Sequence, residues 1–215
     1  MSPRYGRLAL RVRVLYRRLD RRIAGFRREG GLACPRGCGE CCLSPEVEAT
    51  VLEMLPLALR LQRERRLEQT LAGLGPAGPP RPCVFYSPRP LGAFGGRCSV
   101  YPFRPLLCRL FGFSAMTDPQ GRPQLVLCRR LREADPAGAR EAAAGAASGR
   151  LTVPLMSVWS LAMYRLDPGL GTQALPINAA LRQALERVGL EGRLRARGAV
   201  SAGRTAPLQQ PQERP

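Results

Sequence analysis

A chain of 215 residues with 45% hydrophobic residues can build one ordinary core, so its eight cysteines are not needed as a substitute for one. All 34 basic residues are arginine, against 16 acidic residues, which gives a net charge of +18; lysine and histidine are absent. These absences exclude His-based catalytic triads, Cys/His zinc fingers, Schiff-base lysines and P-loop lysines. Thiolate chemistry remains.

The exclusive use of arginine has two interpretations, and both stay open here. It is typical of codon bias in a GC-rich bacterial genome, which also favours the many alanines, glycines and prolines. Alternatively, the positive charge belongs to a surface that binds a polyanion such as nucleic acid.

The first segment, residues 1–31, is predicted to form a basic amphipathic helix. Its apolar residues recur at helical spacing: Leu8, Val12, Leu15, Leu19 and Ile23. Arginines cover much of the remaining surface. A membrane-surface or nucleic-acid contact is an alternative role for the basic face. We find no apolar stretch typical of a secretory signal and no transmembrane segment, so we expect a cytoplasmic protein with reduced thiols.

The nonapeptide CPRGCGECC at residues 34–42 places four cysteines close together: Cys34, Cys38, Cys41 and Cys42. A helix is predicted directly after it, with Ser44 as N-cap, Pro45 at the first helical position and Glu46 near the positive end of the helix dipole. This helix should break or kink at Pro56, and a second helical segment should reach Gly73.

The middle of the chain carries the other four cysteines. Residues 83–86 and 97–101 are predicted to form two short strands that include Cys83 and Cys98. Pro105 suits the first turn of a short helix bearing Cys108, and a hairpin around residues 118–121 should end at Cys128. Residues 32–130 thus form the predicted cysteine-cluster domain.

Residues 131–191 are predicted to supply C-terminal helices that pack on this domain. A surface helix or a partly ordered link over 129–150 is followed by a core helix over 153–166 that carries Leu155, Val158, Trp159, Ala162 and Met163. Asn178 should cap a last helix, and the composition of residues 192–215 predicts a disordered tail. The predicted fold class is α+β: a small, mainly helical, metal-stabilised domain with short β-hairpins in its Cys-rich middle.

Metal ligation is the interpretation that uses all eight thiols. A disulfide framework fits poorly with reduced thiols, and a catalytic dithiol would need only two cysteines. All-thiolate ligation suits zinc or an iron–sulfur cluster. Because neighbouring side chains diverge, Cys41 and Cys42 should not serve one ion equally well, and Cys42 is the less certain ligand. Nearby arginines would compensate the negative charge: Arg36, Arg97, Arg104, Arg109, Arg129 and Arg130.

The nonapeptide resembles the signature of the YkgJ-type cysteine-cluster family, a zinc- or iron-chelating domain with a CxxCxxCC pattern. The segment CSVYPFRPLLCR, residues 98–109, resembles that family's second signature, and Cys83 and Cys128 fall where its outer cysteines are expected. The resemblance covers about residues 32–130 and implies a small metal-binding fold. One departure is the three-residue gap between Cys34 and Cys38.

Three functions stay open after the resemblance. The leading hypothesis is a metal-binding protein whose eight cysteines hold zinc or an iron–sulfur cluster. A flagellin-lysine-methylating protein has a similar cysteine pattern, which keeps a redox or group-transfer enzyme as an alternative. A zinc-knuckle nucleic-acid-binding protein is the third. The sequence specifies no substrate, protein partner or oligomeric state.

Overall fold

The computed structural model describes residues 3–34, 38–75, 81–88 and 95–202. Within them the chain is mainly helical and carries short antiparallel strand pairs, as the predicted α+β class requires. The α-helices are α1 (Pro3–Glu29), α2 (Glu40–Leu43), α3 (Val51–Arg63), α4 (Leu67–Leu74), α5 (Leu106–Leu110), α6 (Arg129–Ala134), α7 (Pro136–Ala147), α8 (Met156–Tyr164), α9 (Pro168–Gly171) and α10 (Ile177–Ala202), with a 3-10 turn at Tyr101–Phe103.

In the described ranges, three two-stranded antiparallel sheets connect these helices. The pair β1 (Glu48–Ala49) and β6 (Leu175–Pro176) joins the start of α3 to the start of α10. The other two are hairpins: β2 (Tyr86–Pro88) with β3 (Gly96–Cys98), and β4 (Ser114–Thr117) with β5 (Pro123–Val126). The first hairpin lies near the predicted strands but differs in its bounds, because β2 begins only at Tyr86 and leaves Cys83 outside the strand, and β3 ends at Cys98. The turn between β4 and β5 lies at residues 118–121, as predicted.

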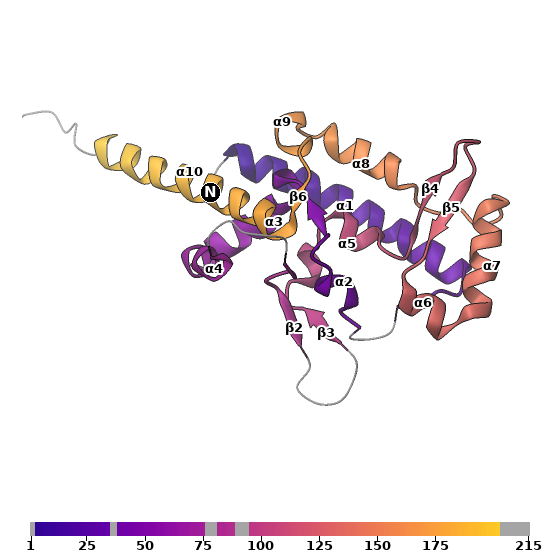
Figure 1. Cartoon of the computed structure of the whole chain (residues 1–215). Helices are drawn as coiled ribbons and strands as arrows, with labels where there is room; N and C mark the ends of the chain where they lie inside the picture. The colour runs from indigo at the N-terminus through magenta and orange to yellow at the C-terminus, as the bar shows by residue number, and fades with distance from the viewer. Residues whose placement is uncertain (1–2, 35–37, 76–80, 89–94, 203–215) are drawn as a thin grey trace, which may run out of the picture.

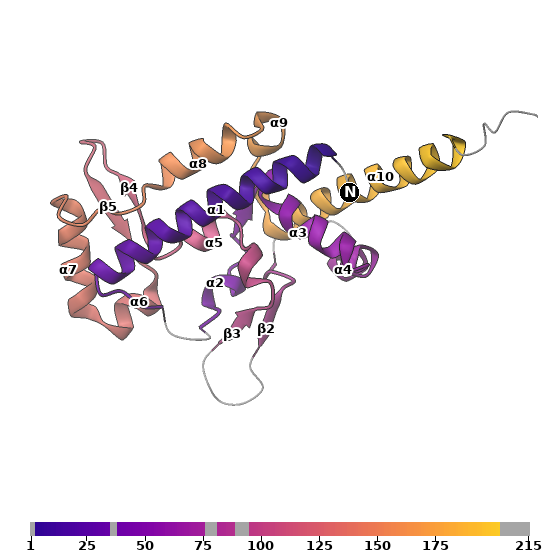
Figure 2. The same ribbon diagram turned by 180° about the vertical axis from the view of Figure 1, so that it is seen from behind.

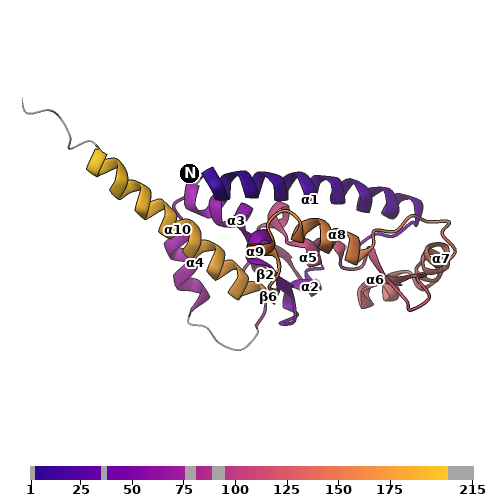
Figure 3. The ribbon, with the colours of Figure 1, turned by 90° about the horizontal axis from the view of Figure 1, so that it is seen from above.

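Helix α3 lies at the centre of the hydrophobic core, between α1 and α10 (Figure 3). Leu52, Leu55 and Leu61 of α3 are fully buried. The predicted apolar stripe of α1 is confirmed, since Val12 and Leu19 are buried against this core while the arginines of α1 face outward. The hairpin β2–β3 and helix α2 lie together at the edge of this helical body (Figures 1 and 2).

The start of α3 differs from the prediction. The helix begins after Thr50, whose hydroxyl accepts the N–H of Glu53, while the Glu53 carboxylate accepts the N–H of Thr50 at 2.8 Å. This reciprocal capping box satisfies two helix donors at once. Ser44 instead accepts the N–H of Glu46 at 3.3 Å in a local turn. The helix also does not end at Pro56, which is buried within α3; the chain turns at Arg65, which has a φ of 58°.

Two predictions for the C-terminal helices are also wrong. Asn178 does not cap α10, because the helix already begins at Ile177. Helix α8 is not a core helix: Met163 is buried, but Val158 is exposed and Trp159 is half-buried. Helix α10 extends to Ala202, so residue 192 lies inside a helix; residues 203–215 of the predicted tail lie outside the described residues. No helix in the described part of the chain is long and apolar enough to cross a lipid bilayer.

Candidate metal centre

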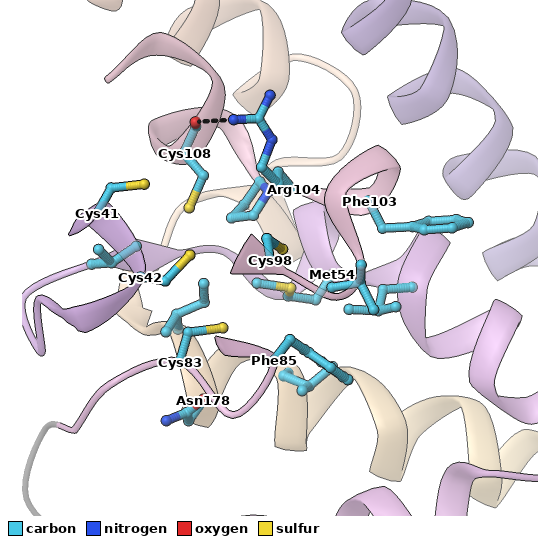
Figure 4. A pocket seen from close by; sticks show the side chains of 16 residues that line it. Cys41, Cys42, Met54, Cys83, Phe85, Cys98, Phe103, Arg104, Cys108 and Asn178 are labelled. Carbon is cyan, nitrogen blue, oxygen red and sulfur yellow. Dashed lines mark hydrogen bonds between the residues drawn. The ribbon is translucent and has the colours of Figure 1, made fainter. Parts of the chain in front are cut away.

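Five cysteines from four separate segments line one cavity (Figure 4). Two belong to α2, one precedes β2, one ends β3 and one lies in α5: Cys41, Cys42, Cys83, Cys98 and Cys108. The cavity has a volume of about 30 Å³. One water needs about 10–15 Å³ on this measure, so the cavity has room for a metal ion or a few waters.

Two glycines allow α2 to approach the hairpin. Gly39 precedes α2 with a φ of 57°, and a Cβ atom there would come within 2.6 Å of the Gly96 carbonyl oxygen. A Cβ atom on Gly96 would in turn come within 2.4 Å of the Ser87 carbonyl oxygen. Any larger residue would force the segments apart. Gly39 therefore sets the distance between α2 and β3, and Gly96 sets the distance between β3 and β2.

Backbone hydrogen bonds connect the thiol-bearing segments. The N–H of Cys83 donates to the carbonyl oxygen of Cys42 at 3.1 Å. Cys98 pairs with Tyr86 across the β2–β3 ladder. Asn178 of α10 fixes the segment before β2 from the other side, because its carboxamide oxygen accepts the N–H of Val84 at 3.0 Å and its nitrogen donates to Pro82 at 2.9 Å.

Three thiols of the cavity share hydrogen bonds. Hydrogen bonding with the Cys42 thiol lowers the pKa of Cys41 to about 6 and that of Cys98 to about 7. The same hydrogen bonds raise the pKa of Cys42 far above its ordinary value. Cys42 thus holds the proton while Cys41 and Cys98 ionise readily. Sulfurs that already share protons occupy positions where a cation can replace those protons.

The other two thiols of the cavity are harder to ionise. Burial raises the pKa of Cys83 to about 11 and raises that of Cys108 further. The Arg104 guanidinium acts in the opposite direction, since its charge helps to lower the pKa values of Cys41, Cys98 and Cys108. Its Nη1 also donates to the Cys108 carbonyl oxygen at 3.0 Å (Figure 4).

Arg109 faces away from this cavity, although we expected it to compensate the charge of the thiolates. Its side chain is buried beside Tyr16, with the guanidinium 4.2 Å from the ring centroid. Nη1 pairs with the Asp20 carboxylate at 2.6 Å, and the other nitrogens donate to the carbonyl oxygens of Pro102 and Arg104. Arg109 therefore fixes the turn that carries Arg104 and anchors α5 to α1.

The remaining cysteines, Cys34, Cys38 and Cys128, lie outside the cavity lining. Partial desolvation raises the pKa of Cys34 to about 11, and the nearby Cys38 and Cys128 thiols add to the increase. Cys128 caps α6, where its sulfur accepts the N–H of Leu131 at 3.4 Å. The structure therefore divides the eight predicted ligands into two groups, which we call the inner thiols (41, 42, 83, 98 and 108) and the outer thiols (34, 38 and 128).

Glu40 links the two groups. Its carboxylate pairs with Arg129 at 3.5 Å and Arg130 at 3.3 Å, which holds α2 next to α6. These two arginines are thus engaged by a carboxylate. Arg97 is exposed, and Arg36 lies outside the described residues. Of the predicted charge-compensating arginines, Arg104 is the one that lines the cavity.

The donor set fits a soft or borderline cation, because thiolates select zinc and iron–sulfur clusters over calcium or magnesium. Among the described residues, no three His, Cys, Asp or Glu side chains lie close enough together to coordinate one metal ion as they stand. All eight cysteines lie within the described ranges, and none of them is in a disulfide.

Sequence reasoning missed two residues that line this cavity. Asn178 was interpreted as a helix cap, and Met54, which lines the cavity from α3, has no distinguishing spacing in the sequence. Asn178 lies far in sequence from Cys83, and Met54 lies on a helix that carries none of the cysteines. Only the tertiary fold brings them to the site.

Comparison with known proteins gives one family-model match, which covers part of the chain. Residues 33–129 match the model of the CxxCxxCC family, described as "Putative zinc- or iron-chelating domain". No curated protein and no solved structure matched the chain. The matched segment begins just before Cys34 and ends just after Cys128, so it contains all eight cysteines. The resemblance predicted from the two cysteine signatures is confirmed by this match, which covers residues 33–129.

Proposed function

We propose that this protein chelates zinc or an iron–sulfur cluster through the thiolates of its cysteine-cluster domain. The observation that carries the proposal is the convergence of the five inner thiols on one cavity. Cysteines that served only as small apolar residues would not be expected to converge from four segments on one cavity and to share hydrogen bonds there. Zinc or iron would replace thiol protons there, and the low pKa values of Cys41 and Cys98 reduce the free energy needed to remove them.

The surrounding residues have defined roles in this proposal. The Arg104 guanidinium compensates the negative charge of the inner thiolates, and its hydrogen bond to the Cys108 carbonyl orients α5. Asn178 positions the segment that carries Cys83. Such supporting partners typically contribute 10–100-fold to metal affinity. The outer thiols, joined to α2 through Glu40, are the candidates for a second set of ligands.

The direct test is metal analysis of the full chain purified without oxygen. We expect at least one equivalent of zinc, or of iron together with acid-labile sulfide. Iron with sulfide and broad visible absorption would identify a cluster, whereas zinc without visible absorption would identify a colourless tetrathiolate site. Less than one equivalent of zinc and iron combined would contradict the proposal.

Two substitutions with a matched control assign the metal to the inner thiols. Cys98→Ser removes an inner thiol that ionises readily, and we expect it to lower the metal content. Met54 lines the same cavity, and the substitution Met54→Leu keeps a similar side-chain volume, so this variant should retain the metal. Cys34→Ser separates the two groups: loss of only part of the metal would indicate two centres, and loss of all of it would indicate one.

A further inference from the structure

Helix α8 presents an apolar stripe to solvent. Val158, Leu161 and Tyr164 follow one another at three-residue spacing, so they lie on one helix face. Their exposed fractions are 55%, 47% and 41%. The helix, MSVWSLAMY, contains no charged residue. Scattered exposed apolar residues are ordinary, but a continuous stripe on an uncharged helix is characteristic of a contact surface.

Arginines of α1 border this stripe. Arg11 donates to the Leu166 carbonyl at 3.1 Å and Arg4 pairs with Asp167 at 3.5 Å, so this side of α1 faces the end of α8. Arg18 and Arg22 follow Arg11 at seven and eleven positions, on the same side of α1, and both are exposed. Figures 1 and 2 show α8 beside α1 along one edge of the molecule.

The charges of Arg18 and Arg22 are not neutralised by an ion pair within the described residues. No ion pair there involves Arg18 or Arg22, whereas the Asp20 carboxylate between them is engaged by Arg109. The edge thus combines an apolar stripe with flanking guanidinium groups. We propose that this edge binds the surface of an anionic lipid bilayer, with the α8 stripe in the headgroup region and the α1 arginines on lipid phosphates.

This combination favours a bilayer over two other occupants. A nucleic acid would neutralise the arginines but would leave the aliphatic side chains of Val158 and Leu161 in water. A second copy of the chain would bring together two surfaces of a protein with a net charge of +18. An anionic bilayer satisfies both parts, since apolar side chains enter the headgroup region and each nearby arginine gains attraction to lipid.

The only tryptophan of the chain, Trp159, makes the contact measurable. It lies half-buried on α8, next to the stripe. The full, metal-loaded chain is mixed with vesicles rich in phosphatidylglycerol, or with vesicles of phosphatidylcholine alone, in about 0.15 M salt. We expect co-sedimentation and a blue shift of tryptophan emission with the anionic vesicles only. Absence of binding to anionic vesicles would overturn the inference, and so would equal binding to both vesicle types.

Matched variants separate the two components of the surface. Val158→Ser with Leu161→Ser removes the stripe, and Arg18→Gln with Arg22→Gln removes charge. Each pair should weaken vesicle partitioning about tenfold or more. Leu190→Ser on α10 and the pair Arg63→Gln with Arg132→Gln change equally exposed positions elsewhere and should leave partitioning unchanged.

The same preparations are also tested with duplex DNA. Tighter binding to DNA than to vesicles, insensitive to the α8 substitutions, would identify a nucleic-acid surface and overturn the inference. Helicity and metal content are measured for every variant, and only variants that match the wild type are compared. Failure of the metal proposal would appear in those metal contents, independently of vesicle binding.

Discussion

The Asn178 carboxamide oxygen accepts a hydrogen bond from the Val84 N–H at 3.0 Å, across 94 residues of sequence. The amide nitrogen of the same side chain donates to the Pro82 carbonyl oxygen at 2.9 Å. Cys83 lies between these two contacts. One polar side chain on α10 therefore fixes the backbone on both sides of an inner thiol, and the C-terminal helix takes part in the candidate metal centre.

Substitution Asn178→Leu should weaken metal binding without unfolding the chain. It removes both hydrogen bonds while keeping similar volume, so the segment around Cys83 becomes mobile. We expect metal affinity to fall about 10-fold, within the range typical of residues that orient metal ligands. Competition with a colorimetric chelator measures the affinity. Gln183→Leu, a half-buried position on the same helix, is the matched control. Unchanged affinity in Asn178→Leu would show that the contact only attaches α10 to the domain.

Selective alkylation of the metal-free chain tests the proton sharing among the inner thiols. The pKa of Cys41 is lowered to about 6 and that of Cys98 to about 7, both first by hydrogen bonding with Cys42, whereas burial raises that of Cys83 to about 11. Thiolates react with iodoacetamide and thiols do not. Near neutral pH, Cys41 and Cys98 should therefore be modified before Cys83, as measured by peptide mass spectrometry.

The pH dependence of this reaction has a definite sign. Groups with lowered pKa values stay ionised above those values, so alkylation of Cys41 should decline only as the pH falls through about 6. Arg104→Gln removes a positive charge that favours the thiolates and should shift this decline to higher pH. The denatured chain provides the control, because its cysteines should all react with an ordinary pKa near 8.5. Equal rates for the three thiols in the folded chain would contradict the proton sharing.

Much of the fold follows from local patterns. The α1 stripe, the two hairpins and the short helix bearing Cys108 depend on periodicity, turn residues and proline, which act over a few positions. The start of α3 could not be predicted from local patterns, because Ser44 and Thr50 both carry a side-chain hydroxyl that can cap a helix. The choice depends on Glu53, whose second oxygen accepts the Leu106 N–H at 2.6 Å. That contact joins residues far apart in sequence and becomes evident only after folding.

The sequence predicted the chemistry of the candidate site, but it did not predict which of the eight thiols lie together. Eight thiols without histidine indicate thiolate ligation from composition alone. Which thiols meet depends on the docking of α2, β3 and α5, as does the contrast between Arg104, which faces the thiols, and Arg109, which faces Asp20. Arg104 and Arg109 lie five positions apart in one short motif, and their residue type does not distinguish their roles. Their opposite orientations follow from the turn at residues 102–105.

Glu53→Gln should destabilise the chain. The buried carboxylate accepts the Thr50 N–H at 2.8 Å and the Leu106 N–H at 2.6 Å, one on each oxygen. Glutamine has a single oxygen, so its NH₂ group would face one of these donors and leave it unpaired. We expect a loss of about 1–3 kcal/mol in the free energy of unfolding, measured by urea denaturation. Glu68→Gln, at an exposed position on α4, should change little.

The pH dependence of this loss follows from the pKa of Glu53. Burial raises it above the ordinary value of 4.5. A raised carboxyl pKa means that the folded state binds the proton more tightly than the unfolded state. The stability that protonated Glu53 contributes is present below about pH 4.5, and it is lost as the pH rises through the pKa of Glu53 in the folded state. The stability gap between wild type and Glu53→Gln should therefore narrow from acid to neutral pH. A gap that widens would contradict the assignment.

Removal of the metal should loosen the cysteine-bearing segments while the helical body persists. The core around α3 contains many buried apolar residues from α1, α3 and α10, and none of the residues that these three helices contribute is a cysteine. Helix α2 and the β2–β3 hairpin, by contrast, are short and lie at the edge of this body. A chelator should therefore leave most of the far-ultraviolet circular dichroism of the helices intact.

Amide hydrogen exchange locates the change. On chelation, exchange should accelerate in residues 38–43, 81–88 and 95–100, and protection should remain in α3. Cys98→Ser should reproduce this pattern without chelator, and Met54→Leu should not. Global loss of helicity on chelation would show that the metal holds the whole chain together, as in a zinc finger that is unfolded without its ion. The size of the metal-independent core favours local loosening, because burial of that many apolar side chains already offsets the conformational entropy of the helices.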